Sequence, residues 1–345
     1  MELLKELCNA HGISGFEDDV RSIMGREFRK SCDSVHMDSF GNVIAKKGKK
    51  GRRIMLAAHI DEIGFIVKHI NEKGFISFVK IGGIDDRLLI NQRVVIKSRK
   101  GNVSGVIGSK PPHLQKDEER KKVIKHDELF IDIGASSKKE AQKRIEIGDP
   151  IIFEPNFGKF NKNIFYGKAI DDRLGCYILL KIMEKIPKNI NAEIFAVGTA
   201  QEEVGLKGAR VAAFKINPDY AFAVDTTIAG DTPMIKETES NLKMGKGPSI
   251  TITEASGRGV VTHPELRDHL IKTAKKNKIP YQIDVLEGGM TDGAIIYLTR
   301  EGVPTGVLSV PCRYIHSPTG IFDIRDVNNS IKLLVKALTN FRNGK

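Results

Sequence analysis

The stretch IFYGKAIDDRLGCYILLKIMEKIPKNINAEIFAVGTAQEEVG, residues 164–205, decides the fold class. It begins with a strand-like run, IFYGKAI, continues into a helical pattern over about 172–186, and ends in a second apolar run at 192–200. A further helix is expected around 207–215, and YAFAVD at 220–225 has the pattern of a short buried strand. Strands that alternate with helices indicate an α/β sheet covered by helices on both faces.

The segments on either side extend this sheet. Ser14 and Glu17 have the spacing of a capping box that opens a helix over about 17–30, and strands are expected near 42–47 and 53–58. Towards the C-terminus the sequence predicts a helix after Pro264, another over about 291–301, a strand at 304–311, and a last amphipathic helix from Asp326 to about 341.

Residues from about 64 to 160 have a different pattern. Short β-rich runs such as GFIVKHI (64–70) and QRVVIKSR (92–99) are separated by glycine and polar turns, which is typical of a small β-barrel or sandwich. The lysine-rich stretch 110–128 has the composition of a loop. We therefore expect a discontinuous α/β catalytic domain, residues 1–63 and 162–345, with an inserted β-rich domain at 64–161.

Composition restricts the class of protein. The chain has 345 residues and a formal net charge of +12, but its lysines are spread out, and the densest run, KKGKKGRR (46–53), is punctuated by glycines as a solvated turn would be. No aromatic platform accompanies the basic residues, so no nucleic-acid partner is expected. No apolar run reaches the roughly 18 residues of a membrane span, so no membrane association is expected. The N-terminus lacks the pattern of a signal peptide, and four scattered cysteines indicate a reducing, cytoplasmic location.

Residues that bind metals follow several of the strand-like runs. They occur in AAHIDEIG (57–64), AIDDRLG (169–175), QEEVG (201–205), VDTT (224–227) and RYIHSP (313–318). Ligands of open α/β sheets bind beyond the carboxyl ends of the strands, so these side chains should meet at one edge. The candidates are His59, Asp61, Asp171, Asp172, Glu202, Glu203, Asp225 and His316.

This set of side chains suits two metal ions. Imidazoles and carboxylates without thiolates favour zinc, cobalt or manganese, and the set exceeds the three protein ligands of a single catalytic zinc. A carboxylate that bridges two metal ions accommodates the ligands beyond these three. Adjacent side chains point in different directions, so Glu202 and Glu203 suit one ligand and one free general base. His59 and Asp61 face the same side of an extended chain, so one can ligate while the other orients it.

The tetrapeptide IDDR occurs twice, at 84–87 and at 170–173. The second copy leads into a helix of the α/β part and is the one expected in the site. Asp85 and Asp86 of the first copy are expected to shape a turn, at most at the rim of the site.

Together with GGMTDGAIIYLTREGVPTGVLSVPCRYIHSPTG (288–320), these stretches resemble the TET-type dinuclear metallo-aminopeptidases over essentially the whole chain. That family includes glutamyl and deblocking aminopeptidases, and some members are labelled cellulase or endoglucanase. The resemblance implies a phosphorylase/hydrolase-like α/β catalytic domain with an inserted PDZ-like β domain that drives dimerisation and assembly. It also implies a homo-oligomer, a tetrahedral dodecamer built from dimers.

The resemblance further implies two divalent metal ions per subunit, zinc or cobalt, with manganese as an alternative. It assigns His59 and Asp225 to one metal, Glu203 and His316 to the other, and Asp171 to a bridge, with a cis peptide between Asp171 and Asp172. Glu202 would be the general base, and Asp61 would orient His59. Met290 departs from the family pattern, which often has a third glycine there, and this affects the shape of the pocket.

The function expected from these features is a metal-dependent aminopeptidase. It would release N-terminal amino acids from short peptides by means of water activated between two metals. A metal-dependent deacylase of acylated amines and a glycoside hydrolase (endoglucanase) are the alternatives among enzymes, and a basic binding module is the non-enzymatic one. The chain has no Trp and only 6% aromatic residues, which is poor equipment for stacking sugars.

Overall fold

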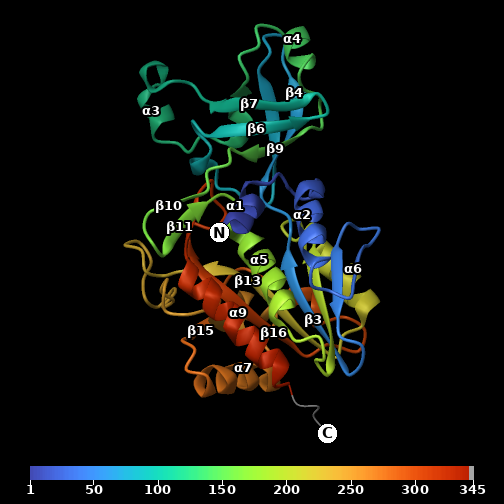
Figure 1. Ribbon diagram of the computed structural model, residues 1–345. Helices are drawn as coiled ribbons and strands as arrows, with labels where there is room; N and C mark the ends of the chain where they lie inside the picture. Colours follow the sequence, from blue (N-terminus) through green and yellow to red (C-terminus); the bar gives the residue numbers. More distant parts are fainter. Residues whose placement is uncertain (342–345) are drawn as a thin grey trace.

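The computed structural model describes residues 1–341 and divides them between a large mixed sheet and a closed barrel (Figure 1). The large sheet has 11 strands. They are β1 (Ser34–Met37), β2 (Val43–Lys47), β3 (Arg52–His59), β10 (Gly158–Lys159), β11 (Ile164–Gly167), β12 (Ala192–Thr199), β13 (Tyr220–Ile228), β14 (Ser249–Thr253), β15 (Gln282–Val285), β16 (Thr305–Arg313) and β17 (Gly320–Asp323).

Parallel strands form the centre of this sheet. The order is β1-β2-β12-β3-β13-β16-β17-β11-β10, and β14 pairs with both β15 and β16. β12 and β13 flank β3 in parallel, with Thr199 opposite His59 and Ala223 opposite Ala57. β16 continues this arrangement beside β13, with Ser309 opposite Asp225. The carboxyl ends of these strands therefore lie at one edge of the sheet.

Helices cover both faces of the sheet, because alternate residues of each central strand point to opposite sides. Ile54, Leu56 and Ala58 of β3 belong to one apolar core, and Met55 and Ala57 belong to another. The first core contains residues of α1 (Glu2–Asn9), α2 (Asp18–Phe28), α5 (Ile170–Lys185), α7 (Pro264–Lys276) and α9 (Ile324–Thr339). The second core contains residues of α6 (Lys207–Ile216) and α8 (Gly293–Ile296). The predicted α/β fold class is confirmed.

The β-rich segment forms a closed barrel with a core of its own (Figure 1). Its strands, in spatial order, are β4 (Gly64–Ile70), β5 (Ile76–Ile81), β8 (Phe130–Asp132), β7 (Gly101–Gly108), β6 (Arg93–Ser98) and β9 (Pro150–Phe153). Short helical segments lie between them: η1 (Asp86–Leu88), η2 (Pro112–Leu114), α3 (Asp117–Arg120), η3 (His126–Glu128) and α4 (Lys138–Gln142). β4 pairs with β9, with Phe65 opposite Ile151, so the two ends of the segment lie side by side.

Three local predictions were wrong. The hydroxyl of Ser14 donates to Asp61 Oδ2 at 2.6 Å, so no capping box forms, and α2 begins at Asp18. The helix predicted over 291–301 is reduced to α8, because the chain turns there and the N–H of Val303 returns to the carbonyl of Tyr297. The last helix begins at Ile324, where the carboxylate of Asp323 accepts from the N–H of Arg325.

Among residues 1–341, no helix combines the length and the apolar character needed to cross a bilayer.

Candidate active site

The polar residues that follow the central strands come together at the carboxyl edge of the sheet. His59 is the last residue of β3, and Asp225 lies near the end of β13. Asp171 and Asp172 lie in the first turn of α5 and are joined by a cis peptide bond. Glu202 and Glu203 follow β12, and His316 follows β16. The structure thus brings together every side chain that was predicted for the site.

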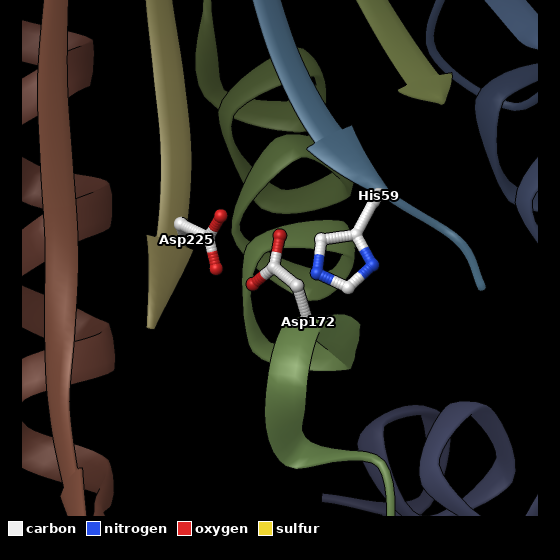
Figure 2. A group of neighbouring side chains, drawn as sticks. All are labelled: His59, Asp172 and Asp225. Atoms are coloured by element: carbon white, nitrogen blue, oxygen red, sulfur yellow. The ribbon is translucent and has the colours of Figure 1, made fainter. Parts of the chain in front are cut away.

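One group of possible metal ligands is fully buried. A ring nitrogen of His59 and carboxylate oxygens of Asp172 and Asp225 lie within 4.8 Å of one another. Figure 2 shows the three side chains, from β3, α5 and β13, pointing toward a common centre. Asp172 Oδ1 accepts from the N–H of Gly175 at 2.8 Å, whereas its Oδ2 has no hydrogen-bond partner. A buried carboxylate oxygen without a partner is costly, and a cation at this centre would satisfy it.

A second group lies beside the first. Ligand atoms of Asp171, Glu203 and His316 also lie within 4.8 Å of one another. Asp171 connects the two groups, because its Oδ1 lies 3.2 Å from Nε2 of His59 and its Oδ2 lies 3.4 Å from Nε2 of His316. One carboxylate thus faces both imidazoles.

Main-chain carbonyls hold both imidazole rings. Nδ1 of His59 donates to the carbonyl of Asp61 at 3.2 Å, and Nδ1 of His316 donates to the carbonyl of Gly83 at 2.9 Å. Because each Nδ1 carries the proton, each Nε2 is the nitrogen that is free to ligate a cation. Gly83 follows β5, so the barrel segment contributes directly to the site.

The carboxylate of Asp61 holds the loop that carries the two glutamates. Its Oδ1 accepts from the N–H of Glu202 at 2.9 Å, and its Oδ2 accepts from the N–H of Glu203 at 3.1 Å. Asp61 Oδ1 also lies 3.4 Å from Nδ1 of His59. This one buried carboxylate therefore fixes the backbone after β12 and lies beside one of the imidazoles.

Burial dominates the electrostatics of the carboxylates. It raises the pKa of Asp172, Asp225 and Glu202 well above their ordinary values, and neighbouring acids add to the shift. Burial also raises the pKa of Glu203 to about 7. Acids crowded in a low-dielectric site resist ionisation unless positive charge is brought in.

Asp171 and the two imidazoles behave differently. Burial would raise the pKa of Asp171, but hydrogen bonds from His316 and His59 lower it below its ordinary value. The same contact raises the pKa of His316 to about 10. Burial opposes protonation of His59, whereas Glu202 and Asp171 raise its pKa well above the ordinary value. These acids and imidazoles stabilise positive charge at the centre of the site, and the donor set fits two divalent cations.

Asp85 and Asp86, in the other IDDR copy, lie outside both groups. Asp85 accepts from the N–H and Nε of Arg87 at 2.9–3.0 Å. Asp86 pairs with Nζ of Lys80 at 2.7 Å. Both carboxylates are occupied by partners close in sequence and shape a turn, as predicted.

Several residues that contribute to the site were not predicted for it. The side chain of Thr199 donates to Asp292 Oδ2 at 2.5 Å, while Asp292 Oδ1 is buried without a partner. Burial raises the pKa of Asp292 to about 6. Glu254 is 0% exposed and accepts from Oγ1 of Thr291 at 2.7 Å. Asp292 lies in the TDG sequence at 291–293, within the stretch that resembles the TET-type aminopeptidases, and Glu254 has no comparable signal in the sequence.

A cavity of about 110 Å³ extends from the two groups. Its floor is formed by His59, Asp171, Asp225, His316 and Glu202, and its walls come from the end of β13 and from the segments that follow β14, β15 and β16. The wall residues are Thr226, Thr227, Ile228, Glu254, Leu286, Gly288, Gly289, Met290, Thr291 and Ile315. Met290, which was expected to affect the shape of the pocket, lies at the cavity.

Comparison with known proteins identifies relatives along nearly the whole chain. A family model described as M42 glutamyl aminopeptidase matches residues 41–333, and a model described as AMPT matches residues 1–24. Lysyl aminopeptidase of Pyrococcus furiosus is 36% identical, over 98% of this chain and 96% of its own length. Glutamyl aminopeptidase of Lactococcus lactis is 32% identical, over 99% of this chain and 96% of its own length.

Solved structures give the same result. A TET aminopeptidase from a marine sediment Thaumarchaeota archaeon is 37% identical with a TM-score of 0.96, over 99% of this chain and 96% of that one. The TET1 peptidase of Pyrococcus horikoshii, which can assemble into a tetrahedron or a large octahedral shell, is 36% identical with a TM-score of 0.88, over 98% of both chains. A Thermotoga maritima protein named an endoglucanase is 35% identical with a TM-score of 0.79, over 97% of this chain and 96% of that one.

Proposed function

Because the chain belongs to the M42 glutamyl aminopeptidase family, whose members are hydrolases that act on peptide bonds, we propose that it releases N-terminal amino acids from short peptides. The observation that carries this proposal is the position of Asp171, whose two oxygens face Nε2 of His59 at 3.2 Å and Nε2 of His316 at 3.4 Å. A carboxylate between two imidazoles, each beside further acids, suits a bridged pair of divalent cations.

In this proposal His59 and Asp225 hold one cation, Glu203 and His316 hold the other, and Asp171 bridges them. Asp172 lies against the first pair and has an oxygen to spare. Zinc or cobalt suits this mixture of imidazole and carboxylate, with manganese as an alternative. When bound, such ions polarise a carbonyl and lower the pKa of a water molecule toward about 7.

Glu202 is the general base of the proposed reaction. It lines the cavity but belongs to neither ligand group, so its carboxylate is free to exchange protons. Burial raises its pKa, which favours a group that accepts a proton from water and then gives it up again. Glu202 takes a proton from the attacking water and returns it to the nitrogen of the leaving peptide. The N–H···Oδ1 bond to Asp61 keeps Glu202 in position for both transfers.

Asp61 is the positioning residue for His59 and for the glutamate loop. Its main-chain carbonyl accepts from His59 Nδ1, and its carboxylate accepts from two consecutive backbone N–H groups. A group so placed reduces the motion of a ligand and of the base together. The acidic floor of the cavity would also attract the positively charged amino terminus of a peptide.

The proposal extends to assembly. The solved P. horikoshii relative assembles into closed shells, which supports a homo-oligomer for this chain, a tetrahedral dodecamer built from dimers. We assign assembly to the inserted PDZ-like domain, expected at 64–161, and catalysis to the remainder of the chain; the last strand of the barrel ends at Phe153, and β10 (Gly158–Lys159) already belongs to the large sheet. The free thiols of Cys8, Cys32, Cys176 and Cys312 are in keeping with a reducing cytoplasm.

The test of the base is Glu202→Gln. We expect turnover of an aminoacyl-anilide to fall by about 10²–10⁴, the usual contribution of general acid–base catalysis, while elemental analysis still finds both metals. Glu237→Gln is the matched control, since Glu237 is exposed and outside the cavity. Unchanged turnover in Glu202→Gln would remove Glu202 from this role.

The name of the Thermotoga relative raises a second candidate, a glycoside hydrolase. Such enzymes use two opposed carboxylates without a metal. Chelation separates the two activities: EDTA should abolish aminopeptidase turnover, and added zinc, cobalt or manganese should restore it. Release of sugar that persists in EDTA would favour the glycoside hydrolase.

A further inference from the structure

Family membership does not define which N-terminal residue this chain accepts, since two relatives are named for lysyl and glutamyl activities of opposite charge. The residues of the cavity walls determine which side chain is accepted. A substrate held by its amine and first carbonyl at the floor would extend its first side chain along these walls.

The walls are apolar where a side chain would contact them. Ile228, Leu286, Met290 and Ile315 supply their hydrocarbon surface. Ile228 is 46% exposed and Met290 is 51% exposed, so both present this surface to whatever enters. The hydroxyl of Thr227 donates to Asp284 at 3.0 Å and is already engaged.

The cavity contains no cation that could pair with an acidic side chain. Among the lining residues, all of which lie in the described part of the chain, none is Lys or Arg. The ring nitrogens of His59 and His316 face the carboxylates of the floor. A glutamate side chain would therefore lose its water without gaining a cation to pair with, and it would approach acids.

A basic side chain finds no free anion on the walls either. Glu254 is the acid there, and it is 0% exposed. Its carboxylate already accepts from Oγ1 of Thr291 at 2.7 Å and from the N–H of Thr291 at 3.2 Å. Because this carboxylate is buried and holds Thr291 of the wall, a substrate ammonium does not reach it.

We infer that this cavity selects an uncharged, apolar N-terminal side chain, of the leucine or methionine type, and rejects acidic ones. The inference depends on the proposed aminopeptidase function and adds the substrate class to it. The expected order is leucine or methionine first, lysine second because the floor is acidic, and glutamate last.

The first experiment is a panel of leucyl-, methionyl-, lysyl- and glutamyl-anilides with the metal-loaded full chain. We expect kcat/KM for leucine to exceed that for glutamate by about 30-fold or more, because an unpaired desolvated charge costs roughly one to two powers of ten in affinity. Calorimetry with the free amino acids should show the same order, with leucine binding more tightly than glutamate.

The second experiment places a cation on the wall. Met290→Lys and, separately, Ile228→Lys should raise kcat/KM for the glutamyl substrate by about 10-fold and lower that for leucine, mainly through KM, since the new contact is already made in the bound substrate. Because a gain on one substrate is required, simple misfolding cannot imitate the result. Met234→Lys is the matched control, since Met234 is 91% exposed and lies outside the cavity.

The outcomes distinguish the inferred side-chain preference from the proposed aminopeptidase function. Faster turnover of glutamyl than of leucyl substrates by the unmodified chain, or no gain in either lysine variant, would overturn the inference and leave the aminopeptidase proposal standing. No turnover of any substrate by protein that contains both metals would overturn the proposed function, and this inference with it.

Discussion

The two copies of IDDR differ most in the surroundings of their arginine and of their first aspartate. In the copy at 84–87 the side chain of Arg87 is 72% exposed and that of Asp85 is 39% exposed. In the copy at 170–173 the side chain of Arg173 is 0% exposed, and that of Asp171, the counterpart of Asp85, is 13% exposed. The first copy lies in a turn of the barrel segment, and the second begins a helix beneath the carboxyl edge of the sheet.

The cations that pair with the acids differ between the two copies. Arg87 turns back onto Asp85 and lowers the pKa of that carboxyl to about 2. Arg173 turns away from its own acids, donating to the carbonyl of Leu7 at 2.8 Å and pairing with Glu62 at 3.2 Å. Burial raises the pKa of Asp172, whereas at its counterpart Asp86 the pair with Lys80 outweighs burial and lowers the pKa. Acids become available as ligands where the adjacent cation has a better partner elsewhere.

The largest effect on turnover should come from replacing the first aspartate of each copy by asparagine. Asp171→Asn removes a charge that both His59 and His316 face, so we expect the dialysed protein to lose bound metal and turnover to fall at least about 10³-fold. Asp85→Asn should change neither. Metal content is measured by elemental analysis, and turnover by release of anilide. Full metal content in Asp171→Asn would end the assignment of Asp171 as a bridge.

A smaller effect, on stability, should follow from replacing the arginine of each copy by methionine. Arg173→Met leaves the carbonyl of Leu7 without its donor and Glu62 with only Lys168, which lies 2.8 Å away. We expect the free energy of unfolding in urea to fall by about 3 kcal/mol, as when a buried pair loses one member. Arg87→Met should leave it unchanged. Equal losses in both variants would show that burial does not distinguish the two copies.

The smallest effect concerns pH in the metal-free protein. The folded-state pKa of Glu203 is raised to about 7 from an ordinary value of 4.5, so the folded state holds this proton more tightly than the unfolded state. Stability should therefore fall as pH rises from about 5 to 7.5, by on the order of 2 kcal/mol for this group. Asp85, with its lowered pKa, contributes its stability above about pH 4 and adds no slope in this window.

Thermal unfolding after exhaustive chelation provides the measurement. Glu203→Gln should flatten the dependence between pH 5 and 7.5, and bound metal should do the same, because the carboxylate then remains ionised in the folded state. A metal-free protein that becomes more stable as the pH rises through this window would contradict the expectation.

The sequence alone could predict the edge of the sheet where the site lies. His59 and Asp225 follow apolar runs, and parallel strands bring such ends together regardless of their exact register. Contacts that depend on distant main chain could not be predicted. Ser14 matched a local capping pattern, yet its hydroxyl bonds Asp61, which is 47 positions away. Tertiary contacts replaced the local interaction.

The walls of the cavity also could not be predicted from the sequence. Met290 could be identified in the sequence as unusual, but its role depends on the neighbouring wall residues, such as Ile228 from another strand. The order of side chains around a pocket is a property of loops, whose paths the hydrophobic pattern does not specify. The buried contact between Glu254 and Thr291, 37 positions apart, has no periodic signal at all.

The hydrogen bond between Gly83 and His316 restricts how this architecture can be rebuilt. Since β4 and β9 are neighbouring strands, a designer could cut out the barrel and rejoin the chain across a gap of about 5 Å. The shortened protein would lose the carbonyl that accepts from Nδ1, at 2.9 Å, and the imidazole would be free to swivel and to change tautomer. A barrel transferred from a homologue, in the laboratory or by recombination, must therefore place a main-chain carbonyl beside Nδ1 of His316 if the protein is to remain active.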